Sequence, residues 1–213
     1  MQKFKELSFK EKLEHIIYYY KWHIIIAIFL MIFSGSLIKG FIEQDKNIPL
    51  GTLSFQGVAT DFEKIEAWED MVTQKIKKAD TQQKVRVDFY SISLDGFDEY
   101  STANMQKYVT LAAVGELDVV CVDEDFFISQ AELGTFMPLD TLPELSVIIE
   151  NNKGNIKKLI PKEQTEEHIY GIKVTDLDAF KDLGYNPEGM IMAISASSKR
   201  LSYCIEILKF IFE

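Results

Sequence analysis

Three adjacent carboxylates form the densest cluster in the sequence that could bind a ligand. Asp123, Glu124 and Asp125 directly follow the apolar run LDVVCV (117–122), which is typical of a buried strand. Oxygen-rich clusters of this kind can hold Ca²⁺ or a cationic solute. Carboxylates also stabilise the positive N-terminal end of a helix. The second interpretation is favoured, because the alternating ligand spacing of a calcium loop is absent. We therefore predict no metal site and no cofactor.

A second group of residues should lie beside these carboxylates. Open α/β sheets bind ligands outside the carboxyl ends of their strands, where the connections diverge. That edge would gather the end of a first strand (48–55) and the acidic cluster, with a phenylalanine as an apolar wall. Each of these residues also has a purely structural explanation. The glycine could form a turn, the glutamine could lie in a solvated loop, and the phenylalanine could belong to the core. The candidate ligand-binding residues are Phe55, Gln56, Gly57, Asp123, Glu124, Asp125 and Phe126.

The sequence contains no recognisable set of catalytic residues. Of its three histidines, His15 and His23 flank an apolar N-terminal segment, and His168 stands alone in a polar stretch. The motifs G-x-S-x-G, G-x-x-x-x-G-K-[ST], C-x-x-C and H-E-x-x-H are missing. We therefore expect that the protein is not an enzyme.

Alternating strand and helix patterns must position the candidate site. The expected strands are 48–55, 84–92 and 117–122, with a helical pattern after each of them. This β-α-β-α-β-α order predicts an open, mostly parallel α/β sheet with right-handed crossovers. The first helix should turn five apolar residues toward the sheet: Phe62, Ile65, Trp68, Val72 and Ile76.

Helix ends are marked by the residues that usually occupy them. The second helix should end at Gly115, and the short third helix should be capped by Asp123 and end at Gly134.

The later part of the chain is less regular. Residues 142–172 have little clear periodicity, whereas 189–197 is typical of a strand. We expect the strands at 49–55, 84–91, 117–122 and 190–196 to share one sheet. The terminal helix should pack on a face of that sheet through Leu201, Cys204, Ile205, Leu208 and Phe212.

The two cysteines allow two interpretations. Cys121 lies in the apolar third strand and Cys204 on the apolar side of the last helix. A disulfide could form in an oxidising compartment. Two buried free thiols are the favoured interpretation.

The N-terminal stretch YYYKWHIIIAIFLMIF (18–33) is typical of a membrane anchor. Its uncharged part, Ile24 to Ile38, has 15 residues, and it reaches 19 at Ile42 if Lys39 points outward. A spanning helix needs about 20. The tyrosines and tryptophan at one end favour the membrane–water boundary. We assign 1–22 to an interfacial amphipathic helix, 23–42 to a bilayer-spanning anchor, 43–48 to a linker and 49–213 to an outer α/β domain.

Charge predicts the orientation of this anchor. Residues 1–22 hold five lysines and three glutamates, whereas residues 40–213 hold 17 basic and 30 acidic side chains. Basic flanks stay in the cytoplasm, so the outer domain should be extracytoplasmic on a single-pass plasma-membrane protein. A cleaved signal peptide is the alternative. It is disfavoured, because the basic leader is long and SGSLIKGF is a poor cleavage site. So acidic a domain is not expected to bind nucleic acid.

Two blocks of the sequence resemble bacterial extracellular solute-binding proteins. In MQKYVTLAAVGELDVVCVDEDFFISQAELGTFMPLDTL, a helix leads to an A-x-G-E-x-D-V strand and later to a G-x-x-x-P-L-D exit. MIMAISASSKRLSYCIEILKFI is similar to that family's closing strand, polar turn and helix. The resemblance implies a periplasmic-binding-protein-like lobe, a small-molecule ligand clamped between two lobes, and a transporter permease as partner.

The resemblance is incomplete between these blocks. Members of the family normally have a second lobe of about a hundred residues or more there, and only residues 143–188 are available, too few for a lobe with its own core. We expect a reduced second lobe. Two functions follow: a membrane-tethered solute-binding relative that serves a transport system, or a binding-incompetent interaction or sensory domain that contacts another membrane protein. A concave pocket above Gln56 and Asp123 would favour the first, and a filled edge the second.

Overall fold

The computed structural model describes residues 9–77, 83–93, 99–162, 165–175, 177–180 and 182–213, without the side chains of residues 9–16 and 37–47. The chain divides into two compact units, residues 1–48 and residues 49–213. Each unit is described by itself below.

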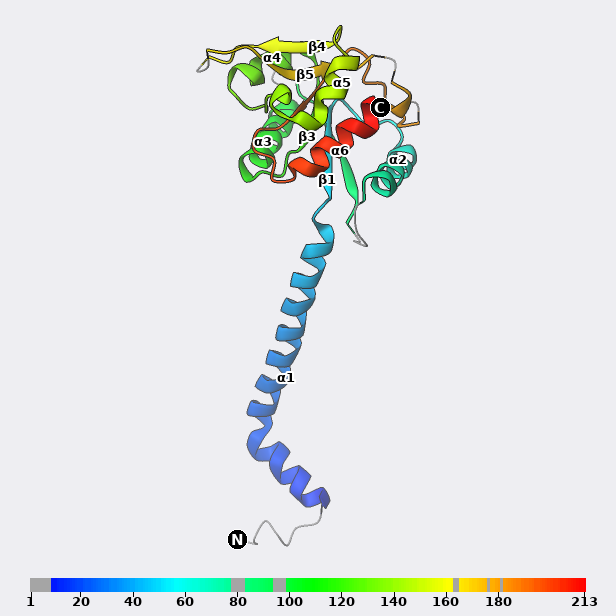
Figure 1. Cartoon of the computed structure of the whole chain (residues 1–213). Helices are drawn as coiled ribbons and strands as arrows, with labels where there is room; N and C mark the ends of the chain where they lie inside the picture. Colours follow the sequence, from blue (N-terminus) through cyan, green and yellow to red (C-terminus); the bar gives the residue numbers. More distant parts are fainter. Residues whose placement is uncertain (1–8, 78–82, 94–98, 163–164, 176, 181) are drawn as a thin grey trace. The chain divides into compact units, whose positions relative to one another are not determined.

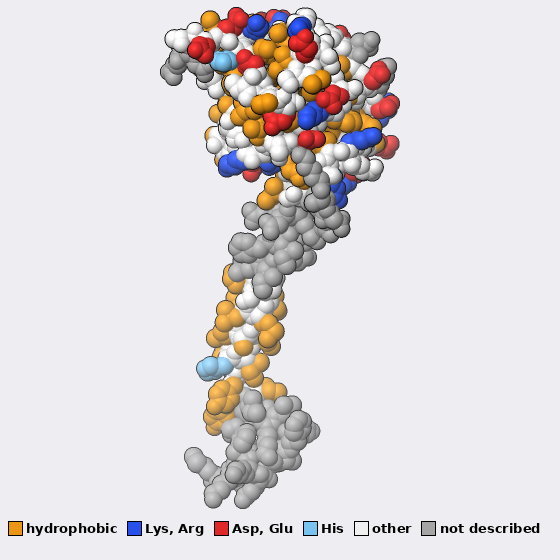
Figure 2. Space-filling view, in the orientation of Figure 1, with side chains coloured by type: hydrophobic (Ala, Val, Ile, Leu, Met, Phe, Trp, Pro, Cys, Tyr) orange, Lys and Arg blue, Asp and Glu red, His pale blue; other side chains and the backbone are white. Residues whose placement is uncertain are grey.

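The first unit is one long helix, α1 (Phe9–Asn47; Figure 1). Its segment Ile17–Ser36 is 20 residues long and apolar enough to cross a membrane, and none of it is buried. Hydrophobic side chains cover much of the visible face of the described part of this helix in Figure 2. The tyrosines at 18–20 and Trp22 are all exposed. The helix continues through residues 43–47, in the range predicted to be a linker.

The second unit is built on one six-stranded sheet (Figure 1). The four strands predicted from the sequence share this sheet, as expected. Two further strands, β4 and β5, come from the segment that had no clear periodicity. In spatial order the strands are β2 (Val85–Tyr90), β1 (Gly51–Gln56), β3 (Val119–Val122), β6 (Ile191–Ile194), β5 (His168–Lys173) and β4 (Ile156–Leu159).

The sheet is mixed, so the prediction of a mostly parallel sheet is wrong. Strand β1 pairs in parallel with β2 and β3, with Leu53 opposite Val87 and Val119. Strand β6 is antiparallel to β3, and the pairs β6–β5 and β5–β4 are antiparallel too. The reason is the hairpin-like return of the chain from β5 into β6, which needs no crossover helix.

Residues 143–188 extend this sheet. They supply β4, β5, the helix α5 (Ser146–Asn151) and the short 3₁₀ helices η3 (Pro143–Leu145) and η4 (Asp178–Phe180). Another 3₁₀ helix, η2 (Leu139–Thr141), precedes them. Within the described residues, this segment belongs to the same compact unit as β1–β3 and forms no second sheet.

Helices cover both faces of the sheet. The helices α2 (Phe62–Ile76) and α6 (Leu201–Phe212) pack on the face that contains Val119 and Cys121. The opposite face, with Val120 and Val122, is covered by α3 (Glu99–Val114) and α4 (Glu124–Glu132). Alternate residues of β3 therefore enter two apolar cores, as the pleat of a buried strand requires.

The predicted helix ends and cysteine states are confirmed. Asp123 accepts a hydrogen bond from the backbone N of Phe126 at the start of α4. Gly115 and Gly134 follow α3 and α4 with φ of 74° and 70°, the left-handed conformation that glycine adopts without strain. Cys121 and Cys204 are free and buried.

Three predicted core positions differ in the structure. Leu201 is half-buried at the start of α6. Phe62 is 77% exposed, because it is the first residue of α2 and precedes the buried face that starts at Ile65. Phe212 is only half-buried at the end of α6, whereas Ile207 and Ile211 are buried there.

Side chains of α2 protect the outer edge of the sheet. The backbone N of Val87 donates to Glu69 Oε1 (2.6 Å), and the backbone N of Val85 donates to Thr73 Oγ1 (2.9 Å). Strand β2 is an edge strand, whose unpaired N–H groups would otherwise be a template for aggregation. The helix α2 therefore closes this edge with hydrogen bonds as well as apolar packing.

The raised pKa of Glu69 leads us to expect that the stability of the outer domain depends on pH. Partial burial raises the pKa of Glu69 above 4.5, against the hydrogen bond from Val87, which lowers it. The folded chain thus holds this proton more tightly than the unfolded chain does. The associated stability is complete below pH 4.5 and is lost as the pH rises through the raised pKa. Urea unfolding measures the free energy of unfolding as the pH rises from 4.5 through the raised pKa. This free energy should decline less with pH in Glu69→Gln than in the wild-type chain.

The matched control for this experiment is Glu63→Gln, at an exposed position of the same helix. It should keep the wild-type decline. An unchanged decline in Glu69→Gln would contradict the assignment to Glu69.

Candidate functional site

The carboxyl ends of β1 and β3 bring two predicted site residues together. Gln56 Nε2 donates to Asp123 Oδ2 (2.5 Å) and to the carbonyl of Ile92 (2.9 Å). In return, the backbone N of Asp123 donates to Gln56 Oε1 (2.8 Å). The other carboxylate oxygen of Asp123 accepts from the backbone N of Phe126 (2.8 Å). The two side chains therefore satisfy each other and the neighbouring backbone.

The remaining carboxylates of the acidic cluster belong to the surface of α4. Glu124 pairs with Lys157 of β4 (2.6 Å), and this hydrogen bond holds the pKa of Glu124 below its usual value. Asp125 is exposed in the first turn of the helix. In the described part of the chain, His, Cys, Asp and Glu side chains form no cluster that could hold a metal ion.

The two phenylalanines of the predicted site lie in the cores. Phe55 and Phe126 are completely buried. Phe55 stacks on Phe89 with ring centroids 5.4 Å apart, and Phe126 makes an edge contact with Tyr108 at 5.3 Å. Neither ring presents a surface at the edge of the sheet.

A loop between β5 and β6 covers the end of β1. We call residues 174–190 the 174–190 loop; positions 176 and 181 in it lie outside the described residues. Two backbone hydrogen bonds close its base, from Val174 N to Met190 O (2.7 Å) and from Gly189 N to Val174 O (2.9 Å). Farther along, Trp68 Nε1 of α2 donates to Ala179 O (2.6 Å). The loop is thus closed at its base and fastened to α2.

Tyr185 of this loop occupies the space directly beyond β1. Its hydroxyl donates to the carbonyl of Gln56 (2.5 Å), and its ring packs 5.3 Å from Phe55 and 5.1 Å from Phe89. A Cβ on Gly57, whose φ is +146°, would lie 2.7 Å from the Tyr185 hydroxyl. Burial raises the pKa of Tyr185 to about 12, so the phenol remains a hydrogen-bond donor at neutral pH. Tyr185 therefore fills the space directly beyond Gln56 and Gly57.

A hollow of about 470 Å³ lies beside this loop. Its walls include Leu177, Phe180, Tyr185 and Pro187, with Glu188 among the lining residues. Gln56 and Asp123 do not line it. It is therefore displaced from the residues that the sequence singled out.

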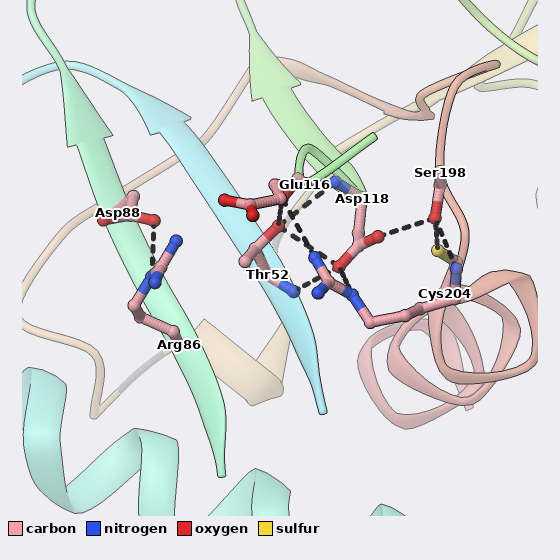
Figure 3. Close-up of polar contacts among 8 residues, drawn as sticks. Thr52, Arg86, Asp88, Glu116, Asp118, Ser198 and Cys204 are labelled. Carbon is pink, nitrogen blue, oxygen red and sulfur yellow. Dashed lines mark hydrogen bonds and ion pairs between the residues drawn. The ribbon is translucent and has the colours of Figure 1, made fainter. Parts of the chain in front are cut away.

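A buried charge cluster lies at the opposite, amino end of the parallel strands (Figure 3). Asp118, immediately before β3, is completely buried. It accepts hydrogen bonds from the backbone N of Thr52 (2.8 Å), from Ser198 Oγ (2.6 Å) and from Arg200 Nε (2.8 Å). Arg200 Nη2 also donates to the carbonyl of Glu116 (3.0 Å). These bonds join β1, β3 and the start of α6.

The thiol of Cys204 lies beside this cluster. Ser198 Oγ lies 3.3 Å from Cys204 Sγ. Burial, together with the nearby charge of Asp118, raises the pKa of Cys204 to about 12. A thiol in that state is protonated at neutral pH and is a poor nucleophile. The described contact of His168 is with another residue, since its Nδ1 lies 3.0 Å from Asp140 Oδ2.

Sequence reasoning did not single out this cluster. A usable signal was present, because Asp118 directly precedes the apolar run VVCV, where a buried charge needs a partner. Arg200 is one of only two arginines in the chain. The pairing of these residues depends on the position of β6, which the sequence pattern did not orient.

Comparisons of the chain with protein-family models, with curated proteins and with solved structures give no match.

Proposed function

We propose that the chain is a membrane-anchored, extracytoplasmic interaction domain, an accessory subunit that contacts another membrane protein. The observation that carries this proposal is the closed carboxyl edge of the sheet. Gln56 and Asp123 bond to each other, and Tyr185 fills the space at Gly57. A small-molecule site requires a concave pocket with a few free polar groups. The contacts above instead pair Gln56 with Asp123 and fill the space beyond Gly57.

The resemblance to solute-binding proteins supports a transport-related role. The two blocks that carry it contribute β3 and β6, which are neighbours in the sheet. The blocks are also joined by the bonds of Ser198 and Arg200 to Asp118. We therefore propose that the outer domain is a single lobe of this kind, with the closing lobe replaced by β4, β5 and the 174–190 loop.

The proposed function requires a permanent anchor. We propose that residues 23–42 span the membrane once, with the lysine-rich N-terminus in the cytoplasm. The support is the apolar segment Ile17–Ser36, with aromatic side chains at one end.

Retention of this anchor can be measured on the mature protein. The intact mass of the chain purified from membranes should include the N-terminal helix, because no good cleavage site follows the apolar segment. Loss of about 35–45 N-terminal residues would identify a cleaved signal peptide instead.

A second candidate function is presentation of a small solute to a transporter. The hollow beside the 174–190 loop favours it, since about 470 Å³ lies within the usual range of ligand pockets, about 300–1,000 Å³. This candidate predicts solute binding by the isolated full-length chain. The proposed interaction function predicts none.

Photocrosslinking in native membranes tests the interaction function. A photoreactive amino acid is placed at four exposed positions, one at a time: Glu66, Val109, Lys153 and Asp182. From at least one of these positions, irradiation should crosslink the chain to a specific membrane protein. The same chains without irradiation provide the control. Failure to crosslink any protein from all four positions would contradict the proposed function.

A further inference from the structure

Two hollows flank the short helix η4 in the 174–190 loop. The first is the hollow of about 470 Å³, and the second, of about 450 Å³, lies between the loop and the end of α6. Leu177 lines both. Phe210 and Phe212 of α6 and Met71 of α2 provide apolar surface in the second hollow. We call the surface formed by the lining residues of both hollows the η4 face.

The apolar side chains of the η4 face are incompletely covered. Met71 is 38% exposed, and Leu177, Phe210 and Phe212 are half-buried. The terminal helix therefore does not bury its last turn as fully as its middle, where Ile207 and Leu208 are completely inaccessible. Partly exposed aromatic and methionine side chains are enriched in protein–protein contacts.

The charged side chains described in the lining of the η4 face are all acidic. Asp178, Asp182 and Glu213 line the second hollow, and Glu188 lines the first. All four are exposed. Among the described lining residues there is no lysine or arginine; Asp176 and Lys181 of the loop lie outside the description. The face thus combines an apolar floor with an acidic rim.

This combination selects the chemistry of a partner. An apolar floor accepts apolar side chains, and an acidic rim attracts lysine and arginine at its border. A negatively charged lipid surface would be repelled by the same rim. A basic amphipathic segment satisfies both features, since one side carries apolar residues and the flanks carry positive charge.

We infer that the η4 face docks a basic amphipathic segment of the partner membrane protein. This inference rests on the proposed interaction function and names the surface and the chemistry of its partner. The apolar side of the segment enters the two hollows on either side of Leu177, and its lysines or arginines meet Asp178 and Asp182.

Binding of model peptides tests the inference. The full-length chain is placed in phosphatidylcholine nanodiscs and titrated with a fluorescent amphipathic peptide of leucine and lysine. A peptide in which glutamate replaces every lysine is the charge control, and empty nanodiscs measure binding to lipid alone. The leucine–lysine peptide should bind the chain beyond the empty-disc level, and the leucine–glutamate peptide should not.

Matched variants locate the binding. The double change Asp178→Asn and Asp182→Asn should weaken leucine–lysine binding roughly fivefold or more, because two exposed ion pairs are lost. Glu63→Gln with Glu66→Gln removes the same charge from the exposed side of α2 and should leave binding unchanged. Asp182→Lys is a second test at an exposed loop position, and melting curves verify that each variant is folded.

Three results would overturn the inference: no binding by the wild-type chain, equal binding of the two peptides, or equal binding by the wild-type and rim variants. Its failure is distinct from failure of the proposed function. Crosslinks from Val109 or Lys153 without peptide binding would keep the interaction function and move the partner to another surface. Absence of crosslinks from every position would remove the function itself.

Discussion

Replacing Asp118 with alanine should destabilise the outer domain by about 3–5 kcal/mol, the usual cost of leaving one member of a buried ion pair without its partner. Asp118 is completely buried, and the side chain of Arg200 is only 17% exposed. The substitution would also remove the acceptor for the backbone N of Thr52 and for Ser198 Oγ. Urea unfolding of the full-length chain, followed by tryptophan fluorescence, measures the change.

A second ion pair in Figure 3 supplies the control. Arg86 Nε and Asp88 Oδ2 of β2 are 2.9 Å apart, with side chains 42% and 20% exposed. Because solvent screens such a pair, Asp88→Ala should cost no more than about 1 kcal/mol. Equal effects of Asp118→Ala and Asp88→Ala would contradict the structural role of the Asp118 cluster.

Removal of α6 should abolish cooperative folding of the outer domain. Truncation at Ser198 deletes five buried apolar residues, each worth about 1.5–3 kcal/mol when fully buried. Together they match the whole stability of a typical domain, about 5–15 kcal/mol. The deletion also removes Arg200 from Asp118. The buried residues lost are Cys204, Ile205, Ile207, Leu208 and Ile211.

Thermal melting followed by near-ultraviolet circular dichroism tests the truncation. The truncated chain should show no cooperative transition. Lys209→Ala, at a half-buried position of the same helix, is the control and should retain the transition. A truncated chain with the full wild-type transition would contradict the placement of α6 in the core.

The regular part of the fold was predictable, because its signals are local. The apolar run before Asp123 marked β3, and the spacing of Ile65, Trp68 and Val72 marked the buried side of α2. Strands β4 and β5 were missed since IKKL and HIYGIK carry lysines or a glycine and lie in a segment without clear periodicity. The direction of β6 depends on those two strands, so its antiparallel pairing could not be derived either.

The position of the candidate site was predictable from the sequence, but the hydrogen bonds of its residues were not. Gln56 and Asp123 follow neighbouring strand ends in the sequence, and in the structure they are in contact. Ligand binding by these residues stays a prediction from the sequence. Their mutual hydrogen bonds and the arrival of Tyr185 depend on the 174–190 loop, whose path no periodic pattern specifies.

Titration of solutes against the full-length chain in nanodiscs tests the central claim most directly, namely that the carboxyl edge is closed and the domain acts through protein contact. Tight capture requires enclosing about 70–90% of a ligand's surface, which a single filled edge cannot do. Calorimetry with sugars, amino acids, peptides and metal ions should therefore detect no binding tighter than about 10 μM, or roughly 7 kcal/mol. A reproducible submicromolar solute whose binding is weakened by changing Gln56 or Asp123 would contradict the closed edge and establish solute presentation instead.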